Sequence, residues 1–188
     1  MPIDTTQNPH HAYNGISIDG GQKMIIFQSF TGIITMIGDL MTGEERSTGC
    51  IKIMTVEDET GNRVNFIVTP TTYFVNHATM AVGDRVIGFY DANAPIPYIY
   101  PPQLQALVMA KVDKIRNIKV DCFDSQLISS DGTLQLNLAL STQIILENGQ
   151  RFTGNLANRD LIVLYRATTR SIPAQTTPDK IIVMCRNI

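Results

Sequence analysis

The chain consists of short runs in which apolar and polar residues alternate. Residues 50–57 and 63–69 are two such runs, and the polar residues 58–62 between them end in Gly-Asn. A polar loop of this length with a late glycine, between two β-branched runs, is typical of a β-hairpin with a bulged turn. No stretch of ten residues has the 3.6-residue period of an amphipathic helix. The pattern therefore predicts an all-β protein.

Further strands are predicted where β-branched and aromatic residues gather between turn-forming residues. Gly32 lies inside the first strand, where we expect a bulge or a sharp bend. Residues 147–150 contain Asn-Gly, which supplies the positive φ values of a tight hairpin turn. Residues 76–82 form at most a short helix. The predicted strands are residues 24–37, 50–57, 63–69, 72–75, 85–90, 104–112, 120–128, 133–138, 142–146, 161–165 and 180–184.

Two distant stretches share one pattern. Residues 88–109 and 164–184 each contain an apolar strand, an irregular bridge with prolines and a second apolar strand. A shift of 75 residues places Phe89 on Leu164 and Met109 on Met184, and a shift of 70 places residues 64–75 on residues 134–145. Because proline fixes φ and lacks a backbone donor, both bridges are predicted to be extended and not helical. The sequence thus predicts two copies of one unit.

Each predicted unit has about five short strands and no long helix, which favours a closed antiparallel barrel without exposed sheet edges. A long bent strand, a hairpin, a connection and two final strands are typical of an oligonucleotide/oligosaccharide-binding (OB) barrel. An SH3-like barrel and a small sandwich are the alternatives. We predict an all-β fold of two tandem small antiparallel OB-like barrels related by internal duplication. The predicted divisions are an irregular N-terminal arm (1–23), a first unit (24–113) and a second unit (114–188). The connector at 114–117 lacks glycine and serine, so the units are expected to touch.

Composition narrows the classes of function. A net charge of -2 and 17% charged residues in 188 give no overall reason to expect binding to phosphate backbones. No apolar stretch is long enough for a membrane span, and no apolar run follows basic residues near the start, so we predict a soluble, cytoplasmic protein without a membrane partner. The odd number of cysteines, widely spaced, fits neither a disulfide framework nor a zinc site. We expect Cys50, Cys122 and Cys185 to be buried and reduced.

Four runs of sequence resemble a known family. They are IMTVEDETGNRVNFIV, FYDANAPIPYIYPPQ, NRDLIVLYRATTRSIPAQTTP and KIIVMC, and the resemblance covers about residues 30–185. The chain resembles an uncharacterised family of Firmicutes proteins, which occur alone and as modules of exported proteins with copper-amine-oxidase-N-terminal-like stalk domains. The resemblance implies a family but no activity, so no catalytic residues are carried over. This sequence differs from the exported members in having no signal peptide.

The first bridge contains the first candidate ligand site. Tyr98 and Tyr100 lie two positions apart in PIPYIYPP and would face the same side of an extended segment. Two such rings can stack a base or a sugar. Packing of the bridge across the mouth of the barrel is the alternative. The second bridge reads SIPAQTTP and has no aromatic residue, so this site would belong to the first unit alone.

The second bridge contains the second candidate. Arg166 and Arg170 lie four positions apart, with Thr176 and Thr177 downstream as hydroxyl donors. Guanidinium groups bind phosphate and carboxylate with two parallel hydrogen bonds, so this set could hold an anion. Pairing of the arginines with local acidic residues is the alternative.

No metal, cofactor or catalytic site is predicted. The adjacent His10 and His11 would point to opposite sides of a strand and could hardly bind one metal ion. Five residues near two turns have side-chain oxygens that a calcium ion could bind, but they lack the spacing of a calcium loop, so we expect solvated turns. His77 is the one histidine inside the repeated region, and no hydrolase, zinc-protease, P-loop or dinucleotide motif accompanies it. An acid/base pair of distant carboxylates stays open. The oxygen-bearing residues are Glu57, Asp58, Glu59, Asp91 and Asn93.

Three classes of function follow. The first is a non-enzymatic binding or interaction module for a protein, a glycan or a second copy of the chain. The second is a single-stranded nucleic-acid binder, which the barrel would permit by analogy. Against it, the hairpin has Glu57, Asp58 and Glu59 where lysines and aromatic residues would be expected. The third is a hydrolase with a non-local site. We expect the first and no enzymatic activity.

Overall fold

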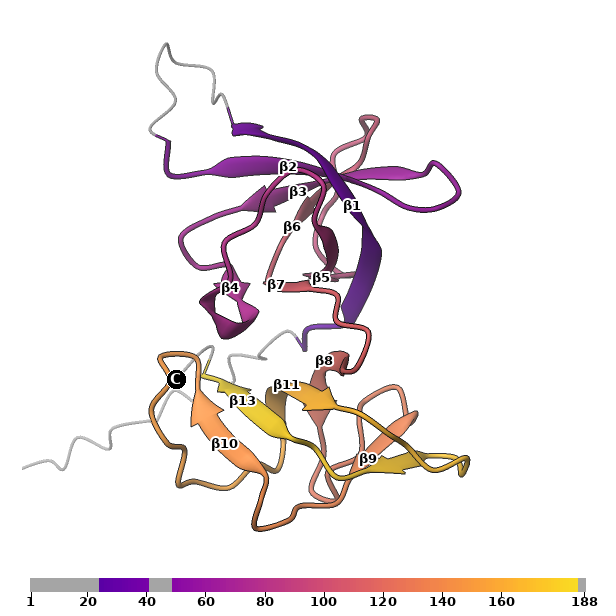
Figure 1. Cartoon of the computed structure of the whole chain (residues 1–188), viewed down its shortest axis with the longest axis vertical. Coiled ribbons are helices and arrows are strands. Elements are labelled where there is room, and N and C mark those ends of the chain that lie inside the picture. Colours follow the sequence, from indigo (N-terminus) through magenta and orange to yellow (C-terminus); the bar gives the residue numbers. More distant parts are fainter. Residues whose placement is uncertain (1–23, 41–48, 186–188) are drawn as a thin grey trace, which may run out of the picture.

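The computed structural model describes residues 24–40 and 49–185, and its regular structure is almost entirely β-strand (Figure 1). Its one helical element over these ranges is the three-residue 3-10 turn η1 (Val75–His77). The all-β prediction is confirmed. The predicted N-terminal arm, residues 1–23, lies outside the described residues.

The first half of the chain forms a seven-stranded sheet in the order β4-β7-β5-β1-β2-β3-β6. The long first strand pairs with the second through residues 33–39 and with the fifth through residues 27–33. The sixth and seventh strands are two pieces of one extended segment, residues 103–111. The sixth is parallel to the third, and the seventh is antiparallel to the fifth. This segment therefore connects the two ends of the strand order. The strands are β1 (Phe27–Asp39), β2 (Lys52–Glu57), β3 (Arg63–Val68), β4 (Tyr73–Phe74), β5 (Arg85–Asp91), β6 (Gln103–Gln105) and β7 (Val108–Lys111).

The second half has a four-stranded sheet, β10-β13-β11-β8, and a two-stranded sheet, β12-β9. Its last long pair of strands, β11 and β13, is antiparallel, as expected for the two ends of the second bridge. The strands are β8 (Asn117–Phe123), β9 (Leu134–Leu136), β10 (Gln143–Leu146), β11 (Arg159–Tyr165), β12 (Ala174–Thr176) and β13 (Lys180–Met184).

All but two of the strand pairings of the first half recur in the described second half. β5 lies between β1 and β7, and β11 lies between β8 and β13, all antiparallel. β3 and β6 are parallel, as are β9 and β12, and the parallel pair β4 and β7 has its counterpart in β10 and β13. β2 has no full counterpart in the described second half, where isolated bridges join Phe123 to Ser129 and Ile128 to Gln135.

Matching hydrogen bonds give the register between the halves. The Leu107 amide donates to the Phe89 carbonyl over 2.8 Å, and the Asp179 amide donates to the Leu164 carbonyl over 2.9 Å. Phe89 and Leu164 are therefore equivalent, as the 75-residue shift predicts, but Leu107 and Asp179 are 72 residues apart. The predicted match of Met109 with Met184 is wrong by three positions, because the second bridge is shorter than the first by that amount.

Three apolar clusters form the core. One lies within the first half around Phe66, and one within the second half around Phe123. The third contains residues of both, including Phe89, Val108 and Ile162. The two halves, which are stacked along the long axis in Figure 1, therefore share a buried apolar layer. The expectation that they touch is confirmed.

Gly32 allows two backbones to approach closely. A Cβ atom on this residue would lie 2.3 Å from the carbonyl oxygen of Glu57, so no other residue fits without a shift of the strands. The bulge of β1 lies further on, between Ile34 and Met36. The predicted bulge is therefore in β1 but not at Gly32, where the close approach of β2 explains the glycine.

Two turns follow the sequence closely. Between β2 and β3, Asp58 Oδ1 accepts the backbone amides of Thr60 (2.8 Å) and Asn62 (2.9 Å), and Gly61 has a φ of 87°. The predicted hairpin is confirmed. At residues 147–150, the Leu146 amide donates to the Gln150 carbonyl over 2.8 Å, so the tight turn is present. A single bridge, from Ile145 to Arg151, follows it in place of a second strand.

One prediction about the cysteines is wrong. All three are reduced, but Cys50 is exposed and Cys122 and Cys185 are half-buried. Cys50 precedes the first residue of β2, so it lies outside the sheet whose alternation would have buried it.

Candidate functional site

The first proline bridge leaves β5 and carries an exposed apolar tip. The Ile99 amide donates to the Pro97 carbonyl over 2.8 Å, which closes a three-residue turn around Tyr98. Tyr98 is fully exposed (108%) and Tyr100 is 78% exposed. Neither ring is packed against the rest of the protein. The turn also interrupts the extended backbone, on which the predicted common orientation of the two rings depended.

We call residues 96–100 the tyrosine tip. Ile96 and Ile99 are 46% and 51% exposed, so four large side chains of the tip face solvent. Between Arg85 and Lys111 the sequence has no basic residue, and its one charged residue is Asp91. The tip is therefore both apolar and distant in sequence from any cation.

Backbone hydrogen bonds anchor both ends of the first bridge. The Ala92 amide donates to the Ile26 carbonyl over 2.8 Å, and the Asn65 amide donates to the Pro102 carbonyl over 2.9 Å. Asp91 Oδ1 also accepts the Asn93 amide over 2.9 Å. The tip thus projects from a segment that is fixed on one side to Ile26, the residue before β1, and on the other side to β3.

The second bridge does not assemble the predicted anion site in full. Arg166 Nε lies 2.8 Å from Asp179 Oδ2, and this carboxylate raises the pKa of the guanidinium through a hydrogen bond and its charge. The Thr176 hydroxyl is buried and donates to the Ala167 carbonyl over 2.6 Å, so its proton is already used. Arg170 is exposed. Arg166 thus follows the alternative, in which a surface arginine pairs with a local acid. It directly follows β11, which lies in the other half of the molecule from β5 and β6, the strands on either side of the tyrosine tip (Figure 1).

The acidic hairpin is occupied by local interactions. Glu57 pairs with Arg63 (2.5 Å) and Glu59 with Arg85 (2.7 Å). Asp58 holds the turn, and hydrogen bonds from the Asn62 and Thr60 side chains lower its pKa to about 2. Across residues 24–40 and 49–185, no group of three or more His, Cys, Asp or Glu side chains is placed to hold a metal ion.

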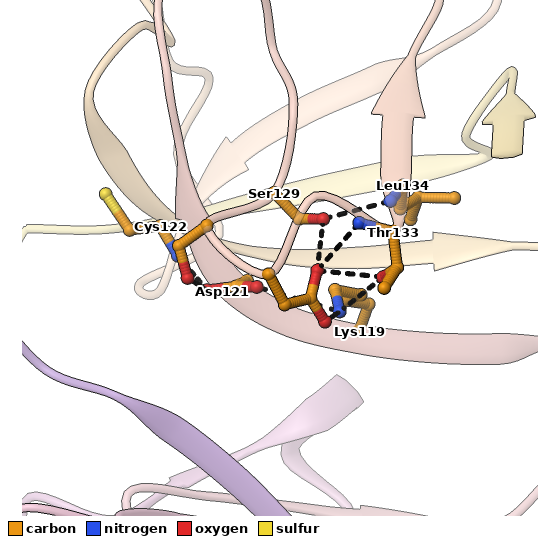
Figure 2. Close-up of polar contacts among 8 residues, drawn as sticks. Lys119, Asp121, Cys122, Ser129, Thr133 and Leu134 are labelled. Atoms are coloured by element: carbon orange, nitrogen blue, oxygen red, sulfur yellow. Dashed lines mark hydrogen bonds and ion pairs between the residues drawn. The ribbon is translucent and has the colours of Figure 1, made fainter. Parts of the chain in front are cut away.

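A polar network in the second half was missed by the sequence analysis. Figure 2 shows Lys119 of β8 beside the turn before β9, where its amine contacts Asp131, Thr133 (3.1 Å) and Asp121 (3.6 Å). Asp131 Oδ1 also accepts the hydroxyl of Ser129 (2.6 Å) and the amide (3.0 Å) and hydroxyl (2.8 Å) of Thr133. The signal in the sequence is the polar turn Ser-Ser-Asp-Gly-Thr, in which the aspartate is surrounded by donors.

Hydrogen bonds and partial burial shift the pKa values of two groups in or beside this network. Partial burial acts to raise the pKa of Asp131, but the hydrogen bonds from Lys119 and Ser129 outweigh it and hold the pKa well below the usual range. Desolvation, and then the charges of Asp160 and Asp121, raise the pKa of the Cys122 thiol, which disfavours the nucleophilic thiolate. No buried side-chain nitrogen or oxygen in the described part of the chain lacks a hydrogen-bond partner. The network therefore ties the 129–133 turn to β8.

Comparison with known proteins gives no match: no protein-family model, no curated protein and no solved structure is similar to the chain. The resemblance to the Firmicutes family stays a prediction. Among the described residues, none of the helical structure is long and apolar enough to cross a membrane.

Proposed function

We propose that the protein is a non-enzymatic binding module whose tyrosine tip holds a neutral partner, either a glycan or an apolar protein surface. The observation that carries this proposal is the full exposure of Tyr98, with Tyr100 and Ile99 exposed beside it on an anchored bridge. Large apolar side chains gathered on one exposed segment are typical of an interaction site.

The physical properties of the tip support binding at low entropic cost. A tyrosine offers a large contact area with two rotatable side-chain bonds, so little freedom is lost when it binds. Pro97, Pro101 and Pro102 restrict the backbone on both sides of the rings. A preorganised segment loses less entropy on binding than a flexible one.

The charge pattern separates the partner classes. Proteins that bind single strands combine stacking rings with a positively charged groove, and phosphate contacts dominate the affinity. No basic residue lies between positions 86 and 110, the stretch that contains the tip, and the hairpin between β2 and β3 has the acidic residues Glu57, Asp58 and Glu59. A neutral glycan or an apolar protein surface, including a second copy of the chain, fits this pattern better.

The fold supports the same proposal by analogy. We propose that each half is a small OB-like barrel and that residues 24–113 and 114–188 arose by duplication. Support comes from the repeated strand pairings and from the equivalent hydrogen bonds of Leu107 and Asp179. In such barrels the connecting loops bind ligands, and the tyrosine tip lies in the connection between β5 and β6.

A binding screen tests the proposed function. Wild-type protein and a Tyr98→Ala/Tyr100→Ala variant are titrated with neutral soluble polysaccharides and with oligo-dT at low salt, and self-association is measured by sedimentation. We expect binding to a polysaccharide, or self-association, that falls tenfold or more in the variant, by analogy with aromatic stacking of bases. Ile172→Ala, at the exposed residue of the second bridge, is the control and should bind as wild type.

Two results would contradict the proposal. Tight oligo-dT binding with a steep salt dependence would support the nucleic-acid alternative. The proposal would also be contradicted if the wild-type protein were a monomer that binds no polysaccharide and if the tyrosine substitutions left its sedimentation unchanged.

A further inference from the structure

A cavity of about 650 Å³ lies between the two halves, away from the tyrosine tip. One wall is η1 with the end of β7, another is the connector at residues 112–116, and the third is formed by β8 and β11. The lining residues are Val75, Asn76, Ala78, Ala110, Lys111, Val112, Asp113, Lys114, Ile115, Arg116, Ile118 and Leu164.

The floor of this cavity is apolar and buried. Val75, Ala110 and Leu164 are each less than 5% exposed, and all three belong to the apolar cluster shared by the two halves. Ile118 packs against the same cluster. Each half contributes part of the floor, so the cavity exists because the halves are joined.

The rim has a surplus of positive charge. Lys111 is neutralised by Asp84 at 2.8 Å. Lys114 and Arg116 have no ion-pair partner within 4.0 Å among the described residues. Asp113, the acidic residue of the lining, uses Oδ1 to accept the Ile115 amide over 2.9 Å.

A second, more polar cavity of about 380 Å³ shares Arg116 with the first and adds Arg166 and Lys180. Arg166 pairs with Asp179, whereas Lys180 Nζ meets the neutral amide oxygen of Asn76 at 3.2 Å. Arg116 therefore lies where the apolar cavity meets the polar one, and the polar cavity adds the ammonium group of Lys180.

We propose that this cleft between the halves binds a small amphipathic anion, with its apolar body on the shared core and its carboxylate or sulfonate at Arg116 and Lys114. The volume is in the range of small-molecule sites, which are commonly apolar with a few polar groups and lie between domains. A guanidinium can form two parallel hydrogen bonds with such a head group, and the ammonium of Lys114 adds a point charge.

The test uses a matched pair of probes, 2-naphthoate and its neutral analogue 2-naphthamide, titrated by calorimetry. We expect one molecule of 2-naphthoate per chain and weaker binding of the amide. Arg116→Gln should weaken naphthoate binding tenfold or more, because a hydrogen bond to a charged group is lost, and should leave amide binding unchanged. Arg151→Gln, at an exposed arginine that lines neither cavity, is the matched control.

A second variant tests the apolar part of the site. Val112 is 38% exposed on the cavity wall, so Val112→Trp should fill the hollow without disturbing the core and should abolish binding of both probes. Circular dichroism checks that each variant folds. The proposal is overturned if millimolar 2-naphthoate does not bind, or if Arg116→Gln and Arg151→Gln bind it as tightly as wild type.

Discussion

Two glycines of the same strand should respond differently to an added methyl group. In Gly32→Ala the new Cβ would lie 2.3 Å from a backbone oxygen, which cannot move aside, whereas at Gly38 the nearest atom is 3.7 Å away on the Ile53 side chain. We expect Gly32→Ala to lower the free energy of unfolding by about 2–3 kcal/mol, as overpacked cores do. Gly38→Ala, the control, should stay within about 1 kcal/mol of wild type. Urea unfolding measures both, and equal effects would contradict the close approach of β1 and β2.

The carboxylate of Asp131 should make stability depend on acid pH. Its folded pKa lies below the value of about 3.9 for an unfolded aspartate, so its contribution is present above that pH and is lost as pH falls toward the folded pKa. Asp131→Asn should lower the free energy of unfolding by about 1 kcal/mol at pH 7, a modest figure because this side chain is 46% exposed.

Unfolding midpoints measured from pH 7 down to pH 2 check this prediction. The difference between wild type and Asp131→Asn should shrink below about pH 4. A constant difference over this range would show that the charge of Asp131 has no part in the stability.

At the scale of elements, one hydroxyl interaction occurs in both halves. Thr72 Oγ1 donates to the Ala106 carbonyl (2.8 Å) and accepts the Thr69 amide (3.0 Å). Thr142 makes the same contacts with Pro178 (2.9 Å) and Ala139 (3.3 Å). Thr72→Val should cost about 1–3 kcal/mol, because its buried partners lose a hydrogen bond. Thr142 is half-buried, so Thr142→Val should cost less.

Thermal unfolding of the single variants and of the double variant measures these costs. Because the two sites lie in different halves, the double variant should be additive within about 0.5 kcal/mol. A Thr142→Val variant that is less stable than Thr72→Val would contradict the order of burial.

Strong local signals made most elements predictable. The hairpin at 57–63 was predictable because aspartate and glycine are typical turn residues: Asp58 accepts a backbone amide of the turn, and Gly61 has a positive φ. β12 (Ala174–Thr176) was missed, because Ala-Gln-Thr has no apolar alternation and becomes a strand only by pairing with β9. The match of Met109 with Met184 was wrong for a similar reason, because the sequences of two strands do not show how many residues the bridge between them needs.

The candidate sites were less predictable than the strands. Exposure of Tyr98 depends on a three-residue turn that periodicity does not reveal, although the aromatic residues themselves were visible. Arg166, which follows β11, pairs with Asp179, which precedes β13, and the whole second bridge lies between them in the sequence. The network of Lys119 and Asp131 joins a strand to a turn twelve residues later, and a single sequence does not show which side chains meet.

At the scale of the whole molecule, the shared apolar cluster decides whether the halves unfold together. Phe89 and Val108 of the first half are packed in one cluster with Ile162 and Ile182 of the second. Separating the halves would expose these side chains to water, which costs about 25 cal/mol for each Å² of apolar surface. The halves should therefore form one cooperative unit, in contrast to domains joined by a flexible linker.

Single tryptophans can report on each half, because the chain has none. Phe30→Trp reports on the first half and Phe152→Trp on the second, since each phenylalanine is half-buried against the cluster of its own half. We expect the two reporters to give the same urea midpoint. Ile162→Ala removes a fully buried side chain of the shared cluster, so it should lower the free energy of unfolding by about 2–5 kcal/mol. The urea midpoints seen by the two reporters should then fall together. If only the Phe152→Trp midpoint falls, the halves unfold separately, and the floor of the proposed cleft is not a shared core.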